Sequence, residues 1–273
     1  MKEAYFEIFD CCFPDMKLSY KRFSELLHND NSIYFEEKEA NEICAFAIVE
    51  EFAIRLMCVI PSKQGRGVGT KLISDIEKYV KDNGFDKIIT GGVSSKLFIG
   101  TPAESWGFFE KQGFVSVGSC DEMILKLEDF QLDKLELHGS DIAEYGWFRG
   151  DMADIKSAVS LVDESWAQYF INPKNIYVAK VNNEIASFCL VDTNCQNYLT
   201  DKYGKVGMPG CVGTVPKFRN KGIALEMVAR VTEYLKAQGM DISFIFFTGV
   251  AGWYEKIGYR SFLSEYFGVK QLG

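Results

Sequence analysis

Two short loops in the sequence combine glycines with basic residues in a spacing that suits phosphate. They read Pro61-Ser-Lys-Gln-Gly-Arg-Gly-Val-Gly69 and Pro216-Lys-Phe-Arg-Asn-Lys-Gly-Ile-Ala224, and both fit the pattern Q/R-x-x-G-x-G/A. An amphipathic pattern follows each loop, so each is expected to lead into a helix. The first helical turn has N–H groups without intrahelical partners, and glycine lets a phosphate approach them. One such loop equally suits an ordinary turn with solvated lysines, but two favour a binding function.

The segment after each loop occurs twice with the same spacing. The apolar residues of Val68–Gly84 return one for one in Ile223–Gly239, at positions i, i+4, i+5, i+8 and i+12 of each segment. This spacing predicts one amphipathic helix in each copy, and the closing glycine suits the left-handed residue that follows a helix. The chain therefore contains an internal repeat, which must be recognised before a fold is assigned.

Further segments repeat in the same order. Ile33–Val49 and Ile176–Val191 each predict a β-hairpin, because alternating, β-branched and aromatic residues flank the polar turns Glu39-Ala40-Asn41 and Asn182-Asn183. Each copy reads helix, helix, hairpin, strand, long helix, strand, short helix, strand. A helix between two strands implies a crossover, so we expect an α/β fold built on a mixed sheet.

The sequence predicts two domains, residues 1–130 and 140–273, which differ in detail. The first copy has about ten extra residues around Val93–Pro102 and the second about a dozen around Asn194–Pro209, and both insertions are expected as substrate-side loops. The first copy begins almost at once with the helical stretch Ala4–Leu27, which leaves no room for a leading strand. We expect this copy either to lack an edge strand or to borrow one from the other copy.

Both halves of the chain resemble the GNAT acetyltransferases, whose acetyl-coenzyme A motif is a strand, a glycine-containing loop and the start of a helix. The resemblance extends to Phe109–Phe114 and Tyr254–Tyr259, which follow further along each copy. It implies two tandem GNAT folds, acetyl-coenzyme A as co-substrate, and a bulged strand before each loop that parts from its neighbour to receive the pantetheine arm. The coenzyme-contacting residues that it implies are Cys58, Val59, Ile60, Gln64, Gly65, Arg66, Gly67, Val68, Gly69 and Thr70 in the first copy, and Gly213, Thr214, Val215, Arg219, Asn220, Lys221, Gly222, Ile223 and Ala224 in the second.

One residue distinguishes the two copies chemically. GNAT enzymes often use a tyrosine to protonate the departing thiolate, and the resemblance gives this role to Tyr254, whereas the first copy has Phe109. A phenol with a pKa of ~10 stays protonated at neutral pH and can donate to a thiolate, and phenylalanine cannot. The second domain is therefore expected to be catalytic. Three roles stay open for the first domain: it binds coenzyme A without turnover, it has a structural role, or its insertion frames a different site. The polar residues of that insertion are Ser94, Ser95 and Thr101.

Acidic and aromatic residues of the second copy are expected to face the acceptor and to attract a cation. They are Asp163, Glu164, Trp166, Tyr169, Asp192 and Tyr198. Each one taken alone is better explained as an ordinary surface acid or a core aromatic residue. No general base is assigned to the acceptor amine, because water can relay its proton.

Composition excludes several classes of protein. The 38 acidic residues outnumber the 30 basic ones, giving a net charge of −8, which argues against nucleic-acid binding. Two histidines and eight cysteines without a C-x-x-C pair offer little for a metal site and suggest reduced thiols. The acidic N-terminal segment is unlike a secretion signal, and the longest apolar run, Ile242–Trp253, is too short to span a membrane. We expect a cytoplasmic, metal-free monomer or homodimer with no nucleic-acid or membrane partner.

The resemblance thus implies an acetyl-coenzyme A-dependent N-acetyltransferase acting on the primary amine of a small molecule, amino acid or peptide. Two alternatives stay open: a coenzyme A-binding regulatory protein without turnover, and a transferase of a longer acyl group. Aminoacyl transfer from tRNA is disfavoured because the chain has no basic stretch.

Overall fold

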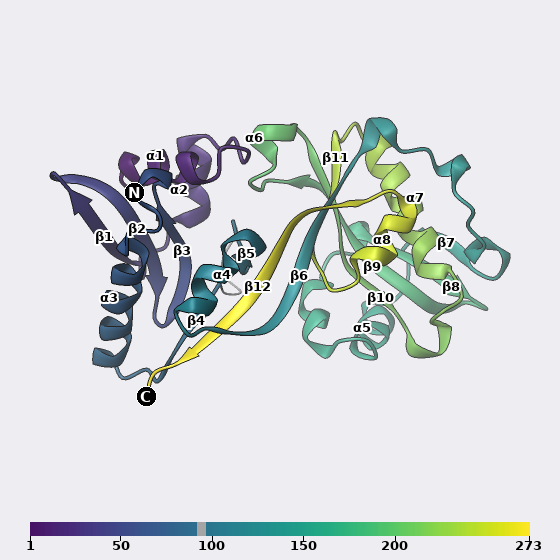
Figure 1. The fold of residues 1–273 in the computed structure, drawn as a ribbon. Coiled ribbons are helices and arrows are strands. Elements are labelled where there is room, and N and C mark those ends of the chain that lie inside the picture. The colour runs from purple at the N-terminus through teal and green to yellow at the C-terminus, as the bar shows by residue number, and fades with distance from the viewer. Residues whose placement is uncertain (92–96) are drawn as a thin grey trace. The chain divides into compact units, whose positions relative to one another are not determined.

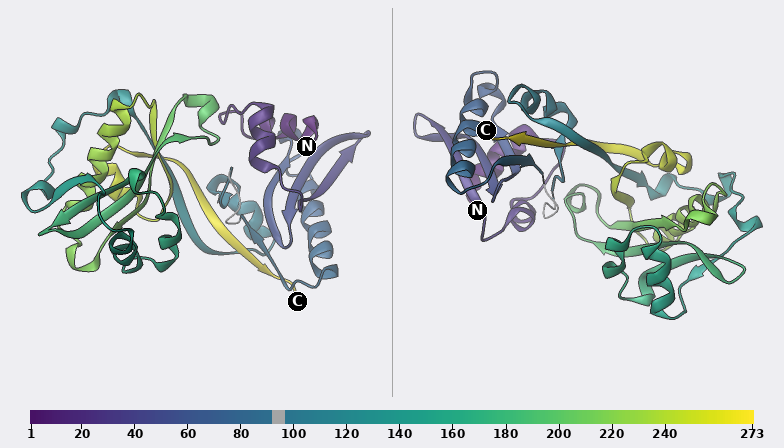
Figure 2. Two further views of the ribbon diagram at one scale, coloured as in Figure 1. Left: turned by 180° about the vertical axis from the view of Figure 1, so that it is seen from behind. Right: turned by 90° about the horizontal axis from the view of Figure 1, so that it is seen from below.

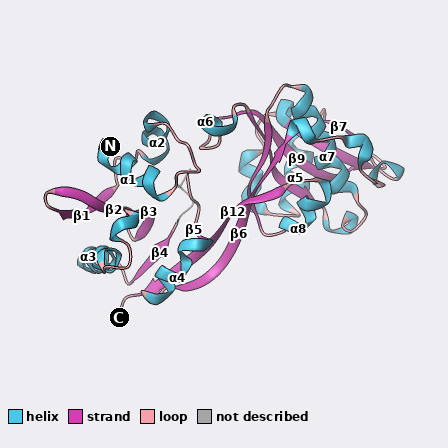
Figure 3. Cartoon of the chain, turned by 45° about the horizontal axis from the view of Figure 1, so that its top comes forward, coloured by secondary structure: helices cyan, strands magenta, loops and turns pink. Residues whose placement is uncertain are grey.

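The computed structural model describes residues 1–91 and 97–273 (Figure 1). Ser94 and Ser95 of the first insertion lie outside the described residues. The chain divides into two compact units, each assembled from more than one segment. Unit 1 comprises Met1–Cys120, Asn197–Lys202 and Leu263–Gly273, and unit 2 comprises Asp121–Gln196 and Tyr203–Phe262. The predicted α/β class with a mixed sheet is confirmed (Figure 3).

Unit 1 has helices packed on a mixed sheet, in which β3 runs parallel to β4, while the pairs β1–β2, β2–β3, β4–β12 and β5–β12 run antiparallel. The sheet order is β1-β2-β3-β4-β12, and β5 also pairs with β12. Its elements are α1 (Glu3–Cys12), α2 (Tyr20–Leu27), β1 (Ile33–Glu39), β2 (Glu42–Glu50), β3 (Ala53–Val59), α3 (Val68–Asp82), β4 (Lys87–Thr90), β5 (Thr101–Pro102), α4 (Ala103–Lys111), the first part of β6 (Val115–Lys126) and most of β12 (Arg260–Gln271).

Unit 2 repeats this arrangement, with β10 and β11 as its parallel pair. The sheet order is β6-β11-β10-β9-β8-β7, and the long helix packs on β8, β9 and β10. Its elements are the second part of β6, β7 (Glu144–Trp147), α5 (Met152–Ser160), β8 (Ile176–Val181), β9 (Glu184–Cys195), β10 (Val206–Thr214), α7 (Ile223–Ala237), β11 (Ile242–Thr248) and α8 (Ala251–Tyr254), while most of α6 (Thr200–Tyr203) belongs to unit 1.

The hairpin turns and helix ends that the sequence predicts have the backbone conformations expected of them. Both hairpin turns place two consecutive residues in the left-handed region: Ala40 and Asn41 in the first, and Asn182 and Asn183 in the second. This is the geometry of a type I′ turn, whose twist matches that of the flanking strands. Both long helices are followed by a left-handed glycine, with φ of 82° at Gly84 and 75° at Gly239. The predicted hairpins and helix ends are therefore confirmed.

Each unit contains a strand segment from the other copy of the repeat. The last strand of the chain, β12, enters unit 1, where Gly268 pairs with Thr90 of β4 (Figure 2). Conversely, the end of β6 belongs to unit 2, where Lys126 pairs with Ile242 of β11. The units thus differ from the predicted division into 1–130 and 140–273, because a strand's place in a sheet is not visible in its local pattern.

The leading edge of unit 1 is β1, and no strand in the described part of the chain precedes it, whereas β7 occupies that edge in unit 2. The borrowed strand joins unit 1 beside β4 rather than at this edge. The second insertion also reaches unit 1, where Tyr198 and Leu199 are buried. There the N–H and hydroxyl groups of Ser19 donate to Asp201 at 2.9 and 2.7 Å, which fixes the insertion at the start of α2.

None of the described helices is both long and apolar enough to cross a membrane.

Candidate active site

The two glycine loops have the same backbone conformation. Gly65 and Asn220 occupy the left-handed region with φ of 70° and 61°, and Gly67 and Gly222 follow with 83° and 75°. Asparagine is among the side chains that tolerate this region best, so its presence in the second loop preserves the turn. Gly67 and Gly222 are the N-cap residues of α3 and α7, each 15 residues long. Both loops therefore present the free N–H groups of a helix start in the same backbone conformation.

A matching side-chain contact braces each loop. Gln64 donates from Nε2 to the carbonyl oxygen of Val59 at 3.0 Å, and Arg219 donates from Nε to that of Thr214 at 3.2 Å. In each case a loop side chain reaches back to the strand before it. This explains why the variable first position of the pattern accepts glutamine or arginine, since both carry an N–H group on a long side chain.

In unit 2 the strands before and after the long helix part from each other. The parallel pairing of β10 with β11 is limited to Val206 with Ile242 and Gly207 with Ser243. Further on, the register of β10 against β9 shifts between Gly210 and Gly213, and Cys211 adopts a φ of 46°. Such a shift with a left-handed residue is a β-bulge. Beyond it, β10 has no partner strand on the β11 side among the described residues, so an extended ligand can pair there.

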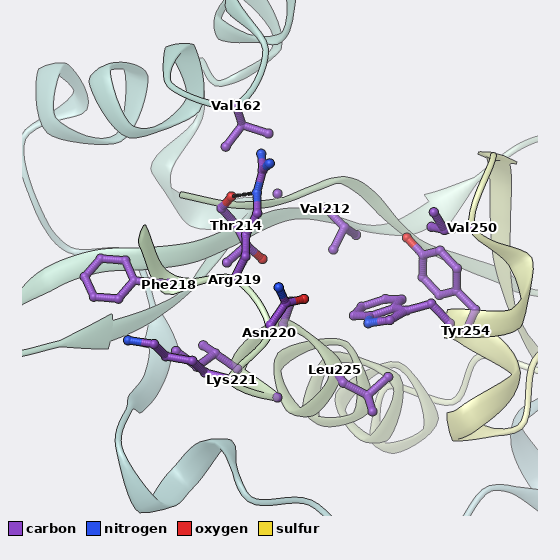
Figure 4. A pocket seen from close by; sticks show the side chains of 15 residues that line it. Val162, Val212, Thr214, Phe218, Arg219, Asn220, Lys221, Leu225, Val250 and Tyr254 are labelled. Atoms are coloured by element: carbon purple, nitrogen blue, oxygen red, sulfur yellow. Dashed lines mark hydrogen bonds between the residues drawn. The ribbon is translucent and has the colours of Figure 1, made fainter. Parts of the chain in front are cut away.

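A cavity of ≈ 390 Å³ lies where β10, the second loop and α8 meet (Figure 4). Eight of the nine residues predicted for this junction line it, and the ninth, Val215, is buried and does not. Six further lining residues were not predicted, of which Trp253 adjoins Tyr254 in the same short helix. The lining residues are Val162, Val212, Gly213, Thr214, Phe218, Arg219, Asn220, Lys221, Gly222, Ile223, Ala224, Leu225, Val250, Trp253 and Tyr254.

Tyr254 lies at the end of the cavity away from Lys221, and in Figure 4 its hydroxyl points from α8 towards Val250. The residue is 6% exposed and its ring meets that of Trp253 edge to face at 4.8 Å. No described residue hydrogen-bonds to its hydroxyl group. Burial, with a smaller contribution from Tyr259, raises the pKa of Tyr254 well above its ordinary value. The hydroxyl therefore keeps its proton at neutral pH and can donate it to a group in the cavity.

The opposite end of the cavity is suited to an anion. Arg219 and Lys221 supply positive charge there, and none of the described residues that line the cavity is acidic. A Cβ added at Gly222 would meet no side chain and only the backbone nitrogen of Gly139, at 3.9 Å, so the space beside this helix start is open. A diphosphate fits such a helix N-terminus. The residues present at this end of the cavity therefore fit a diphosphate-bearing molecule such as coenzyme A.

The corresponding gap in unit 1 is filled by the chain itself. β3 pairs with β4 only through Ala53 and Ile54. Beside the rest of β3 lies the end of the first insertion, in which Leu97 is 0% and Phe98 2% exposed. A Cβ at Gly100 would come within 2.8 Å of the backbone of Tyr266, so this segment is tightly enclosed. The cavity that remains measures only ≈ 40 Å³.

The ten residues predicted in the first copy lie together at the end of β3 and the start of α3, but none of them lines this small cavity. Several are already engaged. The carbonyl oxygen of Val59 accepts from the Cys12 thiol at 3.2 Å, and the Thr70 hydroxyl accepts from Gln112 at 3.2 Å. The buried Cys58 thiol is hydrogen-bonded with Cys12, and burial raises its pKa. Thr101 is buried and lines the small cavity, where Phe109 replaces the tyrosine of the other unit.

Comparison with known families identifies the repeat. Residues 148–262 match one model described as an acetyltransferase (GNAT) domain, and residues 29–116 match a second model with the same description. The chain carries two GNAT acetyltransferase domains in tandem. The matches include both glycine loops and, in the second domain, Tyr254. A search of curated proteins found no match.

Solved structures share this tandem GNAT fold at low sequence identity. The glucosamine N-acetyltransferase region of a fungal multi-domain GH3 β-N-acetylglucosaminidase has a TM-score of 0.77 at 20% identity, covering 98% of this chain and 36% of that one. The present chain therefore spans about a third of that protein. A GNAT protein from Sphaerobacter thermophilus has a TM-score of 0.67 at 16% identity, with coverages of 98% and 91%. A tandem GNAT protein from the clavulanic acid biosynthesis pathway scores 0.62 at 9% identity, with coverages of 99% and 94%.

In the described part of the chain, no group of three or more His, Cys, Asp or Glu side chains is placed to hold a metal ion.

Proposed function

We propose that the protein is an acetyl-coenzyme A-dependent N-acetyltransferase whose second domain transfers the acetyl group to a primary amine of a small molecule or peptide. The observation that carries this proposal is a cavity that extends from a helix start suited to an anion to the hydroxyl of Tyr254, beside the point where β10 and β11 part. Among the described residues, this hydroxyl has no hydrogen-bond partner. A regulatory protein that only binds coenzyme A would not need a proton donor at the thiol end of its site.

In unit 2, the glycine loop and β10 bind the coenzyme, and Tyr254 transfers the proton. Backbone N–H groups from Asn220 to Ala224 hold the diphosphate, and Arg219 and Lys221 balance its charge. The free edge of β10 pairs with the pantetheine arm and presents an N–H group beside the bulge to the thioester oxygen. One such preplaced donor contributes about 3 to 4 kcal/mol to transition-state stabilisation. Acetyl-coenzyme A supplies the activated acetyl group when bound.

The transfer itself forms one bond and breaks one. The amine nitrogen bonds to the carbonyl carbon, the carbon–sulfur bond breaks, and sulfur takes the proton of Tyr254. The tyrosine regains a proton from solvent, which also receives the proton that the amine loses. No general base is assigned, because none of the described residues that line the cavity is a carboxylate or a histidine. Holding the amine against the thioester contributes about 7 to 11 kcal/mol of the barrier reduction, so little further side-chain chemistry is required.

We propose that unit 1 is a structural partner without turnover. Its gap contains Leu97 and Phe98 instead of an open cavity, and Phe109 has no proton to give. Its glycine loop keeps the shape of the family motif, but the loop leads to no space for a thioester.

The test is coenzyme A release by the full chain with acetyl-coenzyme A and a panel of primary amines that includes glucosamine, the amine for which the fungal relative's acetyltransferase region is named. We expect amine-dependent release, one acetylated amine per thiol by mass spectrometry, and one coenzyme A bound per chain by calorimetry. Binding without release for every amine would favour the regulatory alternative. A series of longer acyl-coenzyme A substrates tests the other alternative. No binding and no release would overturn the proposal.

A further inference from the structure

Two cysteine thiols of unit 1 are in contact although they lie far apart in the sequence. Cys12 is the last residue of α1, and this helix packs on β2 and β3 (Figure 1). Its thiol donates to the carbonyl oxygen of Val59 at 3.2 Å and is also hydrogen-bonded with the thiol of Cys58, the preceding residue of β3. Both contacts place the Cys12 sulfur against the end of β3. Both cysteines are reduced, so together they form a dithiol.

The two thiols differ in exposure and in acidity. Cys12 is half-buried, whereas Cys58 is 2% exposed. The hydrogen bond with Cys58 lowers the pKa of the Cys12 thiol, and burial raises the pKa of the Cys58 thiol. The thiolate is the form that reacts with an oxidant, and exposure decides which sulfur meets the oxidant first. An oxidant therefore reacts with Cys12, and Cys58 is placed to react with the product.

The neighbouring thiols of unit 1 have other surroundings. The buried Cys44 thiol donates to the carbonyl oxygen of Glu37 at 3.5 Å. Cys11 precedes Cys12 in α1 and is exposed, and no described residue hydrogen-bonds to its thiol. Cys11 is thus the more accessible of two adjacent cysteines, while Cys12 is the one in contact with a second thiol. A comparison of the two separates the effect of exposure from the effect of pairing.

We propose that Cys12 and Cys58 form a reversible oxidation site that closes a disulfide when the protein meets hydrogen peroxide. The Cys12 thiolate attacks one peroxide oxygen, the O–O bond breaks, and Cys12 becomes a sulfenic acid. The Cys58 sulfur then bonds to the Cys12 sulfur, the sulfur–oxygen bond breaks, and the oxygen leaves as water with the Cys58 proton. In all, two thiols lose two electrons and two protons, and the peroxide is reduced to two waters. A thiol reductant reverses the change by exchange.

The disulfide would join α1 to β3 covalently within unit 1. It closes a loop in the unfolded chain, so the oxidised protein should be more stable than the reduced one. A disulfide sulfur carries no proton, so Cys12 could no longer donate to Val59. The carbonyl oxygen of Val59 would still accept from Gln64, at 3.0 Å, which keeps the first glycine loop braced against β3. The site does not involve unit 2 and is independent of the proposed acetyl transfer.

The test treats the unmodified, folded chain with a small excess of hydrogen peroxide. Free thiols, counted after denaturation, should fall by two from the eight of the reduced chain, and the intact mass should fall by two hydrogen atoms. Peptide mapping should find Cys12 joined to Cys58, and dithiothreitol should restore both thiols. No loss of thiols, a disulfide between other cysteines, or oxidation of Cys12 without a bond to Cys58 would each overturn the inference.

Three variants and one stability measurement make the test sharper. Cys12→Ser should form no disulfide with Cys58, and Cys58→Ala should leave Cys12 as a sulfenic acid that dimedone labels. Cys11→Ser is the matched control and should still form the bond, so loss of the bond there would overturn the inference. In the unmodified protein, the urea midpoint should be higher after oxidation than after reduction. An equal or lower midpoint would show that the bond does not fit the native packing, and would also overturn the inference.

Discussion

The gap beside β10 and the gap beside β3 have the same origin but different contents. In each unit a parallel strand pair is joined over only two residues and then parts, and a glycine loop follows the first strand. Beside β10 the space is a cavity of ≈ 390 Å³, whereas beside β3 the segment Leu97–Pro102 leaves ≈ 40 Å³. A family fold and a family loop are therefore not enough for a site, because what fills the gap decides whether a substrate can enter.

The filled gap is built as tightly as a protein core. The Phe98 ring meets that of Phe13 at 5.0 Å, and a Cβ at Gly91 would come within 2.2 Å of the carbonyl oxygen of Ile99. Opening this gap would expose the buried side chains of Leu97 and Phe98, at a cost of roughly 1.5 to 3 kcal/mol for each. A ligand would have to repay this cost before it gained any affinity, so unit 1 is expected to remain closed.

The sharpest test of the comparison removes the hydroxyl group that only one gap has. Tyr254→Phe should lower kcat about 100-fold, because the leaving thiolate loses its proton donor. Thermal stability should stay the same, since the hydroxyl has no hydrogen-bond partner among the described residues. The measurement is steady-state coenzyme A release, with circular dichroism as the control for folding. The reciprocal change, Phe109→Tyr, should add no activity, and an unchanged kcat in Tyr254→Phe would remove Tyr254 from the mechanism.

A second test addresses what holds the filled gap closed. Glu265 is 0% exposed and accepts from the N–H group of Gly100 at 3.2 Å, and burial raises its pKa to about 7 from an ordinary 4.5. A raised carboxyl pKa means that the folded state holds the proton more tightly. This stability is fully present below about pH 4.5 and is lost as pH rises through 7, by an amount on the order of 3 kcal/mol.

Urea unfolding across this pH range measures the loss. In Glu265→Gln the side chain keeps an acceptor for Gly100 and cannot titrate, so this part of the pH dependence should disappear. The Cys120 thiol also faces the carboxyl, and Cys120→Ser controls for its contribution. A pH profile identical in Glu265→Gln and the unmodified protein would show that another group is responsible.

The test with the smallest expected effect compares the two glycine loops directly. Gly222→Ala and Gly67→Ala each place a Cβ at a left-handed residue, and each should cost about 1 kcal/mol of stability. Neither Cβ meets a side chain within 4 Å. Gly222 lines the cavity that is proposed to hold the coenzyme, so KM for acetyl-coenzyme A should rise about tenfold, whereas Gly67→Ala should leave it unchanged. Equal increases from both substitutions would mean that both loops bind the coenzyme.

The sequence predicted the elements whose cause is local. The type I′ turn at Asn182-Asn183 and the helix end at Gly239 follow from the backbone preferences of single residues, and the repeat doubled the signal. The eight lining residues of the second junction were predicted through the family motif. Val162 and Val250 were not, because apolar residues at the end of a helix and after a strand look like any core residue until the fold brings them to the cavity.

Two features could not be predicted from the sequence, for a different reason. They are the segment that fills the gap beside β3 and the strand segment that each unit takes from the other copy of the repeat. Leu97 and Phe98 are apolar residues within an insertion, a hint of burial, but nothing near them in sequence says which space they occupy. Likewise, β12 has the alternating pattern of any strand, and its partner Thr90 lies far from it in the chain. Long-range pairing depends on the competition between sheets rather than on local propensity.

The position of β12 has a consequence for biosynthesis. Residues 1–120 are synthesised before residues 263–273, but the sheet of unit 1 contains strands from both segments. Until the final segment emerges, β4 exposes an unpaired edge, the kind of surface that associates with other nascent chains. The sheet of unit 1 can thus be completed only after residues 263–273 have been synthesised, although most of that unit precedes unit 2 in the chain.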